Sequence, residues 1–190
     1  DRIFSLIAYA KEFGTIANIK RRQVYEFNGC ECNIGNLVQQ LRKEYKDFVL
    51  DNVSFCIEPK SIVGFIGTNG SGKSTTIKSI LGLIQSKSDK INYFGKSFFE
   101  DEKSIKNRLG IVLDEGYFYE TLTIEQMKSV IAPVYDNWEE KVFCELIDKF
   151  GLMKKQKIST LSKGMKMKFS IALALAHHAE LIIMDEPTSG

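Results

Sequence analysis

Residues Ser61 to Thr75 read SIVGFIGTNGSGKST, and this stretch decides the fold. Its first six residues form a nearly continuous apolar run, which is typical of a strand buried on both faces of a sheet. The glycines at 67, 70 and 72 let the backbone bend, so that successive N–H groups point into one concavity at the start of a helix. The stretch therefore predicts a strand over 61–66, a phosphate-binding loop, and a helix from about 73 to 83.

The side chains of this loop suit a nucleotide. Lys73 adds a cation for the outer phosphates and is expected to act in catalysis as well as in binding. The hydroxyl of Ser74 can ligate a magnesium ion that bridges the phosphates. The predicted nucleotide-binding residues of the loop are Gly67, Thr68, Asn69, Gly70, Ser71, Gly72, Lys73, Ser74 and Thr75.

A second apolar run, Leu181 to Met184, ends in two acids, Asp185 and Glu186. A strand of this kind, parallel to the strand before the loop, would bring Asp185 to the magnesium ion. Glu186 would then reach a water in line with the terminal phosphate and act as the general base. The pair of acids favours hydrolysis of the nucleotide over phosphoryl transfer to a second substrate.

Apolar periodicity predicts the elements between these motifs. Strands are expected over 53–57, 91–94 and 109–113, and a helix should open with a capping box at Thr123 and Gln126. A second helix should open with a capping box at Asp136 and Glu139 and end at Gly151.

Two further helices are predicted at the ends of the chain. A long helix is expected over 163–178, and its final His177 and His178 would suit the negative end of the helix dipole. The apolar residues between Ile3 and Ala10 recur at helical spacing, so we expect a short amphipathic helix there.

Composition excludes several classes of protein. The chain has 26 Lys plus Arg against 24 Asp plus Glu, a net charge of +2, which gives no broad footprint for nucleic acid. It has no apolar run near the length of a membrane-spanning helix. Its four cysteines are too sparse for a disulfide framework, which points to a reducing compartment.

Residues 160–165 read TLSKGM at the start of the long helix, and here the chain resembles the ATP-binding subunits of ABC transporters. The signature of that family reads LSGGQ. This chain matches it at Leu161, Ser162 and Gly164 and departs from it at Lys163 and Met165. The match continues in register through ALAHHAELIIMDEPTSG at residues 174–190. The resemblance covers about residues 37–190 and is greatest to the exporter branch related to bacitracin and multidrug ABC-2 systems.

The resemblance implies an α/β fold: a P-loop NTPase core with a mainly parallel sheet, antiparallel strands near the N-terminus, and a helical subdomain that carries the signature. It implies an ATP-binding domain over 36–190, with the helical subdomain at about 115–165. Residues 1–35 would be an extension of unknown role. We expect the domain to be incomplete at its C-terminus, because the family's D-loop begins at the last residues.

The resemblance also assigns roles to single residues. Ser162 and Gly164 would bind the nucleotide held by a second subunit, so that two chains enclose two ATP molecules head to tail. Tyr45 would stack on adenine, with Phe48 as its substitute. Asp114 stands where the family has its Q-loop glutamine, and it can still ligate magnesium. The implied cofactors are ATP and Mg²⁺.

The expected function is that of an ATPase subunit of an exporter. Its partners would be a second ATP-binding subunit, identical or different, and membrane-spanning permease subunits, with no nucleic acid. It would lie in the cytoplasm, on the inner face of the cell membrane. The alternatives are a soluble ABC ATPase acting on ribosomes or nucleic acid, and a P-loop kinase.

Overall fold

The structure of the protein is a computed structural model that describes residues 3–9, 15–18, 36–57, 62–67, 70–88, 90–113 and 117–185. The chain divides into two units, Asp1–Ile105 and Lys106–Gly190.

In the first unit, four strands form an antiparallel sheet in the order β4-β3-β6-β7. These strands are β3 (Asn36–Glu44), β4 (Val49–Ile57), β6 (Lys90–Tyr93) and β7 (Lys96–Ser97). The strand predicted over 53–57 is the second half of β4, and the one predicted over 91–94 is β6. The long hairpin of β3 and β4 turns at residues 45–48, where the N–H of Tyr45 donates to the carbonyl of Phe48.

The strand that leads into the phosphate loop is β5 (Ile62–Gly67), as predicted. It pairs in parallel with β2 (Thr15–Asn18) and antiparallel with β1 (Ile3–Tyr9). The helix expected at Ile3 to Ala10 is therefore wrong. A short apolar run fits the period of a helix as well as that of a strand. Here pairing with β5 satisfies the backbone hydrogen bonds of the segment, whose Ile, Phe and Tyr residues favour strands.

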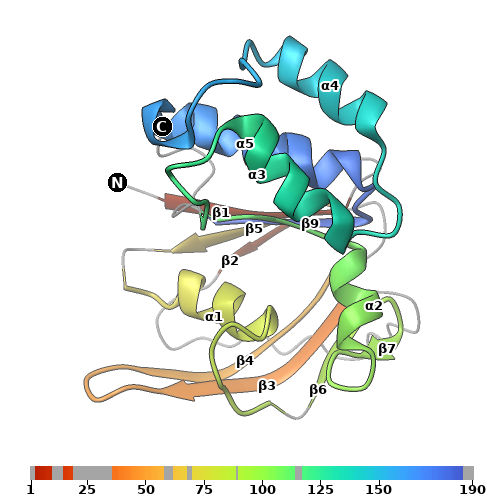
Figure 1. The fold of residues 1–190 in the computed structure, drawn as a ribbon. Coiled ribbons are helices and arrows are strands. Elements are labelled where there is room, and N and C mark those ends of the chain that lie inside the picture. The colour runs from red at the N-terminus through yellow and green to blue at the C-terminus, as the bar shows by residue number, and fades with distance from the viewer. Residues whose placement is uncertain are drawn as a thin grey trace. The chain divides into compact units, whose positions relative to one another are not determined.

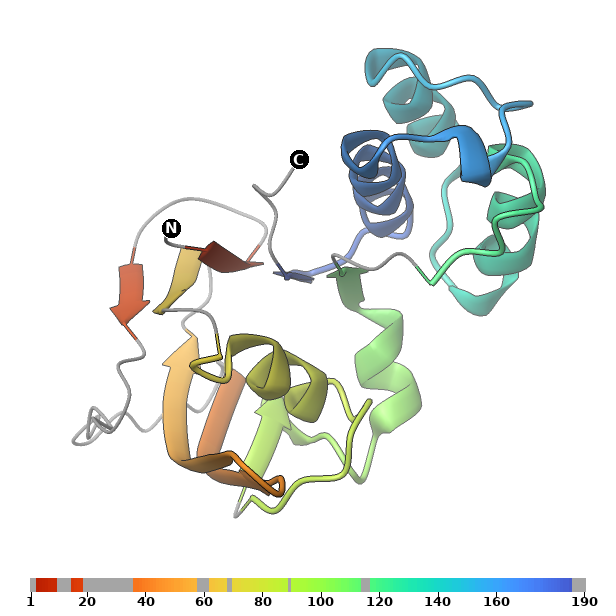
Figure 2. The ribbon, with the colours of Figure 1, turned by 90° about the vertical axis from the view of Figure 1, so that its left-hand side faces the viewer.

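The helix after the loop is α1 (Lys73–Ile80), which contacts β3, β4 and β5. It lies between β5 and the β3–β4 hairpin (Figure 1) and runs across one face of the antiparallel sheet (Figure 2). Its buried residues Ile77 and Ile80 join the sheet residues Leu41 and Ile91 in the core of this unit. It ends before the predicted residue 83 because Gly82 takes a positive φ of 68°.

In the second unit, β8 (Leu109–Val112) and β9 (Leu181–Met184) pair in parallel, and both were predicted. α2 (Glu102–Asn107) precedes β8 in the chain. Helix α5 (Lys163–Ala176) contacts β8. The approach is close at Gly110, where an added Cβ would lie 2.7 Å from the Cβ of Ala174.

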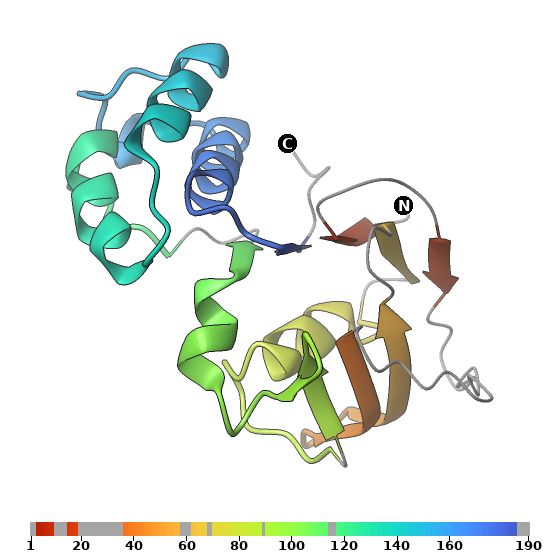
Figure 3. The ribbon, with the colours of Figure 1, turned by 90° about the vertical axis from the view of Figure 1, so that its right-hand side faces the viewer.

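Helices and short 3₁₀ turns build the rest of the described part of this unit (Figure 3). They are α3 (Ile124–Ile131), η1 (Ala132–Val134), α4 (Glu140–Lys149), η2 (Ile158–Thr160) and α5. Their apolar faces share one core. Its buried residues are Ile124, Met127, Phe143, Ile147, Leu152, Ile158, Leu161, Phe169, Ala172, Leu173 and Ala176.

The predicted capping box at Thr123 and Gln126 is confirmed at the start of α3. The second box is wrong, because the N-cap Glu139 of α4 makes no side-chain cap. Asp136 instead accepts a hydrogen bond from Asn107 at 2.6 Å, and Glu139 binds His178 at 2.8 Å. Gly151 follows α4 with a φ of 67°, as a glycine at a helix end should.

Cys56, in β4, is disulfide-bonded, whereas Cys144 is a free thiol. The expectation of reduced cysteines is thus wrong for Cys56, because spacing along a chain does not show which cysteines the fold brings together. Across the described ranges, the helices are all too short or too polar to cross a bilayer.

Candidate functional site

The phosphate loop turns into α1 through two glycines in the left-handed region. Gly70 has a φ of 74°, and Gly72, the N-cap of α1, has a φ of 98°. An added Cβ at Gly72 would lie 2.7 Å from Cδ1 of Leu50 and 3.0 Å from Cζ of Phe48. Gly72 is therefore required both for its backbone conformation and for the close approach of the β3–β4 hairpin.

Lys73 reaches back over the loop that precedes it. Its side chain is buried, and Nζ donates a hydrogen bond to the carbonyl of Gly67 at 2.9 Å. One turn on, the N–H and hydroxyl of Thr76 both donate to the carbonyl of Gly72. The ammonium of Lys73 is thus held at the N-terminus of α1, where a phosphate would interact with both the cation and the helix dipole.

A further feature of the loop is the hydroxyl of Ser71, which is buried. The residue is 8% exposed, and within the described part of the chain its Oγ has no hydrogen-bond partner. A buried hydroxyl without a partner costs free energy that a bound oxygen would recover. Because the first turn of α1 also holds no acidic residue, these features fit an anionic ligand such as a phosphate group.

The β3–β4 hairpin brings an aromatic pair beside this loop. The rings of Tyr45 and Phe48 lie 6.3 Å apart between centroids, and Phe48 packs against the Gly72 position. Tyr45 is 46% exposed. Tyr45, the residue predicted to stack on adenine, thus belongs to the same unit as the loop. Phe48 lies between them in contact, because its ring pairs with Tyr45 and also packs against the Gly72 position.

Asp185 directly follows β9 in the second unit. It is buried, and its N–H donates to the carbonyl of Val112 at 2.9 Å. Because β8 and β9 are parallel with Val112 opposite Met184, Leu113 and Asp185 follow neighbouring strand ends. Four predicted site residues, Thr68, Asn69, Asp114 and Glu186, lie outside the described residues.

Ser162 is the N-cap of α5, and its Oγ accepts a hydrogen bond from the N–H of Met165 at 3.2 Å. Accepting that bond leaves the hydroxyl proton able to donate to a second partner. A Cβ added at Gly164 would meet no atom within 4 Å, so the backbone there is accessible. The first turn of α5 holds no acid, and the exposed residue between them is Lys163.

Two features of the site region could not be recognised from residue patterns alone. One is the contact between Lys43 and Tyr45, in which Nζ lies 5.3 Å from the ring centroid, because Tyr45 follows the end of β3 and strand alternation does not extend to it. His177 is buried and stacks on Tyr135 with ring centroids 3.7 Å apart, so the expected helix-end cation is wrong. Burial lowers the pKa of His177.

The residues expected to ligate Mg²⁺ include Ser74 in the first unit and Asp185 in the second. A hydroxyl and a carboxylate are the oxygen ligands that Mg²⁺ takes beside phosphate groups. Within the described ranges, no group of three His, Cys, Asp or Glu side chains gathers as a metal site. The shared magnesium site stays a prediction.

Comparisons with known proteins agree with the features of the loop and of α5. The bacitracin transport ATP-binding protein of Bacillus licheniformis is 36% identical over 143 residues, which are 74% of this chain and 47% of that protein. An ABC-type transporter ATP-binding protein of Bacillus subtilis is 38% identical over 147 residues, 75% of this chain and 60% of that protein. The chain thus spans about half to three-fifths of the length of these relatives.

The fold agrees as well. A solved structure of an ATP-binding subunit of an ABC transporter superposes with a TM-score of 0.61 and 26% sequence identity, over 76% of this chain and 62% of that chain. The family described as ABC transporter matches residues 50–189, a range that holds the phosphate loop, Ser162 and Asp185. The expected resemblance is confirmed, and the chain belongs to the ABC transporter family.

Proposed function

We propose that this protein binds ATP with Mg²⁺, hydrolyses it, and uses the cycle to power an exporter. The observation that carries the proposal is the phosphate loop. Gly72 opens α1 in the left-handed region, Lys73 lies over the loop, and the Ser71 hydroxyl is buried without a partner in the described part of the chain.

In this proposal the phosphates sit on the N–H groups of residues 67–75, and Lys73 faces the outer phosphates. Tyr45 receives the adenine ring, because it is exposed on the hairpin that packs against Gly72. Ser74 and Asp185 would hold Mg²⁺, with Asp114 as a further ligand. When bound there, the ion would supply positive charge against the phosphates.

Hydrolysis rests on the acids that follow β9. Glu186 accepts a proton from the attacking water, and the neighbouring Asp185 stays with the metal. The position of Asp185 supports this division, because it is buried directly after β9, with its N–H bonded to the carbonyl of Val112 in β8.

We further propose that two ATP-binding subunits, identical or different, close on two ATP molecules. The start of α5 supports this step, since Ser162 can donate its proton while Gly164 leaves the backbone accessible. An N-terminus of a helix attracts a phosphate, and the resemblance assigns this one to the nucleotide of the second subunit.

The names of the relatives support a role in transport, with partners in the membrane. The names of both curated relatives describe transport proteins, one of them for bacitracin. We therefore propose membrane-spanning permease subunits as partners and a place on the cytoplasmic face of the membrane. The alternative, action on ribosomes or nucleic acid, has less support because the net charge is only +2.

Substitution of the loop lysine tests nucleotide binding. We expect Lys73→Ala to weaken the affinity for ATP with Mg²⁺ by about tenfold or more in calorimetric titration, because a charge-assisted hydrogen bond to phosphate is lost. Lys78→Ala, in the same helix, is the matched control and should bind as the parent does. Equal affinities of the parent and Lys73→Ala would contradict the proposal.

A further inference from the structure

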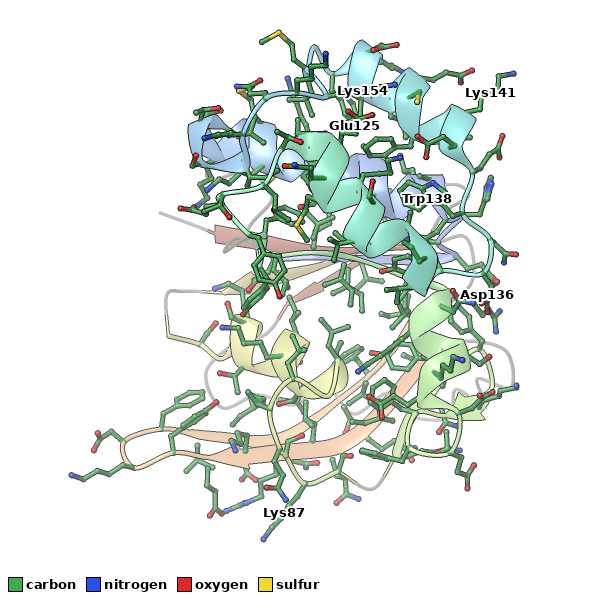
Figure 4. All side chains as sticks on the ribbon, viewed as in Figure 1. Lys87, Glu125, Asp136, Trp138, Lys141 and Lys154 are labelled. Atoms are coloured by element: carbon green, nitrogen blue, oxygen red, sulfur yellow. The ribbon has the colours of Figure 1, made fainter. Side chains whose placement is uncertain are left out.

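The hairpin that presents Tyr45 contacts both the start of α1 and the segment that follows this helix. At the N-terminal end, Phe48 and Leu50 contact the Gly72 position. Beyond the C-terminal end of α1, Arg42 in β3 exchanges two backbone hydrogen bonds with Lys87, at 2.7 and 2.9 Å. Lys87, labelled in Figure 4, lies on the segment that follows α1. The hairpin that carries Tyr45 is therefore joined to the chain on both sides of α1.

Lys43 adds a side-chain contact to this attachment. Its Nζ donates to the carbonyl of Gln85 at 2.5 Å and lies 5.3 Å from the centroid of the Tyr45 ring. The contact borders a cavity of about 320 Å³. The lining residues are Arg42, Lys43, Glu44, Gln85, Ser86 and Lys87.

The acids beside Lys43 are engaged with another cation. Arg42 pairs with Glu44 at 2.7 Å and with Asp51 at 2.5 Å. The ammonium of Lys43 therefore faces a carbonyl oxygen and the π-electrons of Tyr45. A cation within about 6 Å of a ring centroid is attracted to that ring, which restricts how the ring can turn.

We propose that Lys43 is a positioning residue for the nucleobase. It holds the Tyr45 ring in one orientation through its charge, and the exposed part of the ring receives the adenine. This inference rests on the proposed function, in which Tyr45 is the adenine platform. A residue with this task contributes to the binding of ATP but contributes nothing to the binding of the phosphates alone.

Calorimetric titrations of the full chain with two ligands, MgATP and inorganic tripolyphosphate with Mg²⁺, test the proposal. We expect Lys43→Met to raise the Kd for ATP by about two- to fivefold, the size of an exposed cation–π contact, and to leave the Kd for tripolyphosphate unchanged. Lys43→Arg keeps the charge and should restore the parent's affinity for ATP. Lys46→Met, in the turn of the same hairpin, is the matched control.

The other results are equally informative. An equal rise in Kd for both ligands would assign Lys43 a purely structural task and overturn the proposal. So would a lowered melting temperature of Lys43→Met with an unchanged ratio of the Kd for ATP to the Kd for tripolyphosphate. Unchanged ATP affinity in Lys43→Met, with weakened affinity in Tyr45→Ala, would overturn the role of Lys43 but agree with Tyr45 as the adenine platform. Unchanged ATP affinity in Tyr45→Ala would remove the platform itself, and the proposal with it.

Discussion

Single residues in the phosphate loop are determined by two kinds of constraint, and Gly72 is subject to both. Its φ of 98° disfavours any side chain, and Leu50 and Phe48 occupy the space that a side chain would need. Gly70 has a φ of 74° but open space around it. A comparison of substitutions at Gly70 and Gly72 therefore distinguishes the cost of backbone strain from the cost of steric overlap.

We expect Gly72→Ala to lower the free energy of unfolding more than Gly70→Ala does. Gly70→Ala should cost about 1–2 kcal/mol for the left-handed backbone alone. Gly72→Ala should add about 1–3 kcal/mol for the overlap with Leu50 and Phe48. Urea unfolding of the two variants measures the difference, and equal losses would show that the hairpin moves aside without cost.

Among the elements, α5 links the signature at its start to a buried histidine at its end. The two ring nitrogens of His177 lie 2.9 Å from the carbonyl oxygen of Leu173 and 3.1 Å from that of Leu109 in β8. Two carbonyl acceptors favour the charged ring, which has two donors. Burial opposes the charge more strongly, the nearby His178 adds to that opposition, and the pKa of His177 falls below its ordinary value of 6.5.

This shift predicts a pH-dependent stability. The folded state favours neutral His177, whereas the unfolded chain takes up the proton near pH 6.5. The contribution of His177 to the free energy of unfolding is therefore complete above pH 6.5. It is lost as the pH falls through the folded-state pKa. The loss has a limiting slope of about 1.4 kcal/mol per pH unit. We expect the unfolding free energy of the parent to approach that of His177→Gln on acidification.

The exposed neighbour His178, which binds Glu139 and not the core, supplies the control. The difference between the parent and His178→Gln should lack this decrease. If the difference between the parent and His177→Gln grew at low pH, the two carbonyls would outweigh burial, and the sign argued above would be wrong.

At the scale of the whole molecule, the proposed catalytic groups belong to two units and the proposed signature acts on a second chain. Lys73 and Ser74 lie in the first unit, and Asp185 and Ser162 in the second. Their assembly around one nucleotide stays a prediction. The pairing with a second chain can be tested by the oligomeric state of the protein in the presence of ATP.

We expect Glu186→Gln to bind MgATP without turnover and to form a dimer that depends on ATP, measured by light scattering after size exclusion. Adding Gly164→Asp should abolish this dimer. The new carboxylate fits the open space at Gly164 and suits the helix N-terminus, but it would repel the partner's nucleotide. Adding Gly164→Ala should leave the dimer intact. A dimer that forms equally without ATP would contradict the enclosed-nucleotide arrangement.

Local patterns allowed much of this protein to be predicted. The phosphate loop, the helix after it, β9 and the capping box at Thr123 and Gln126 all follow from residues a few positions apart. The family followed from Leu161, Ser162 and Gly164 in register with the acids after β9. Such features are readable because backbone bending, helix capping and strand burial depend on nearest neighbours along the chain.

Tertiary structure alone decided the features that join distant residues. Residues 3–9 became a strand because β5 offered hydrogen bonds, although their spacing also fits a helix. Asp136 accepts a hydrogen bond from Asn107 instead of capping a helix. Lys43 contacts both Tyr45 and the segment after α1. The sequence by itself determined the phosphate loop and the family, whereas the tertiary structure decided what surrounds them, because a contact between distant residues depends on the packing of the whole chain.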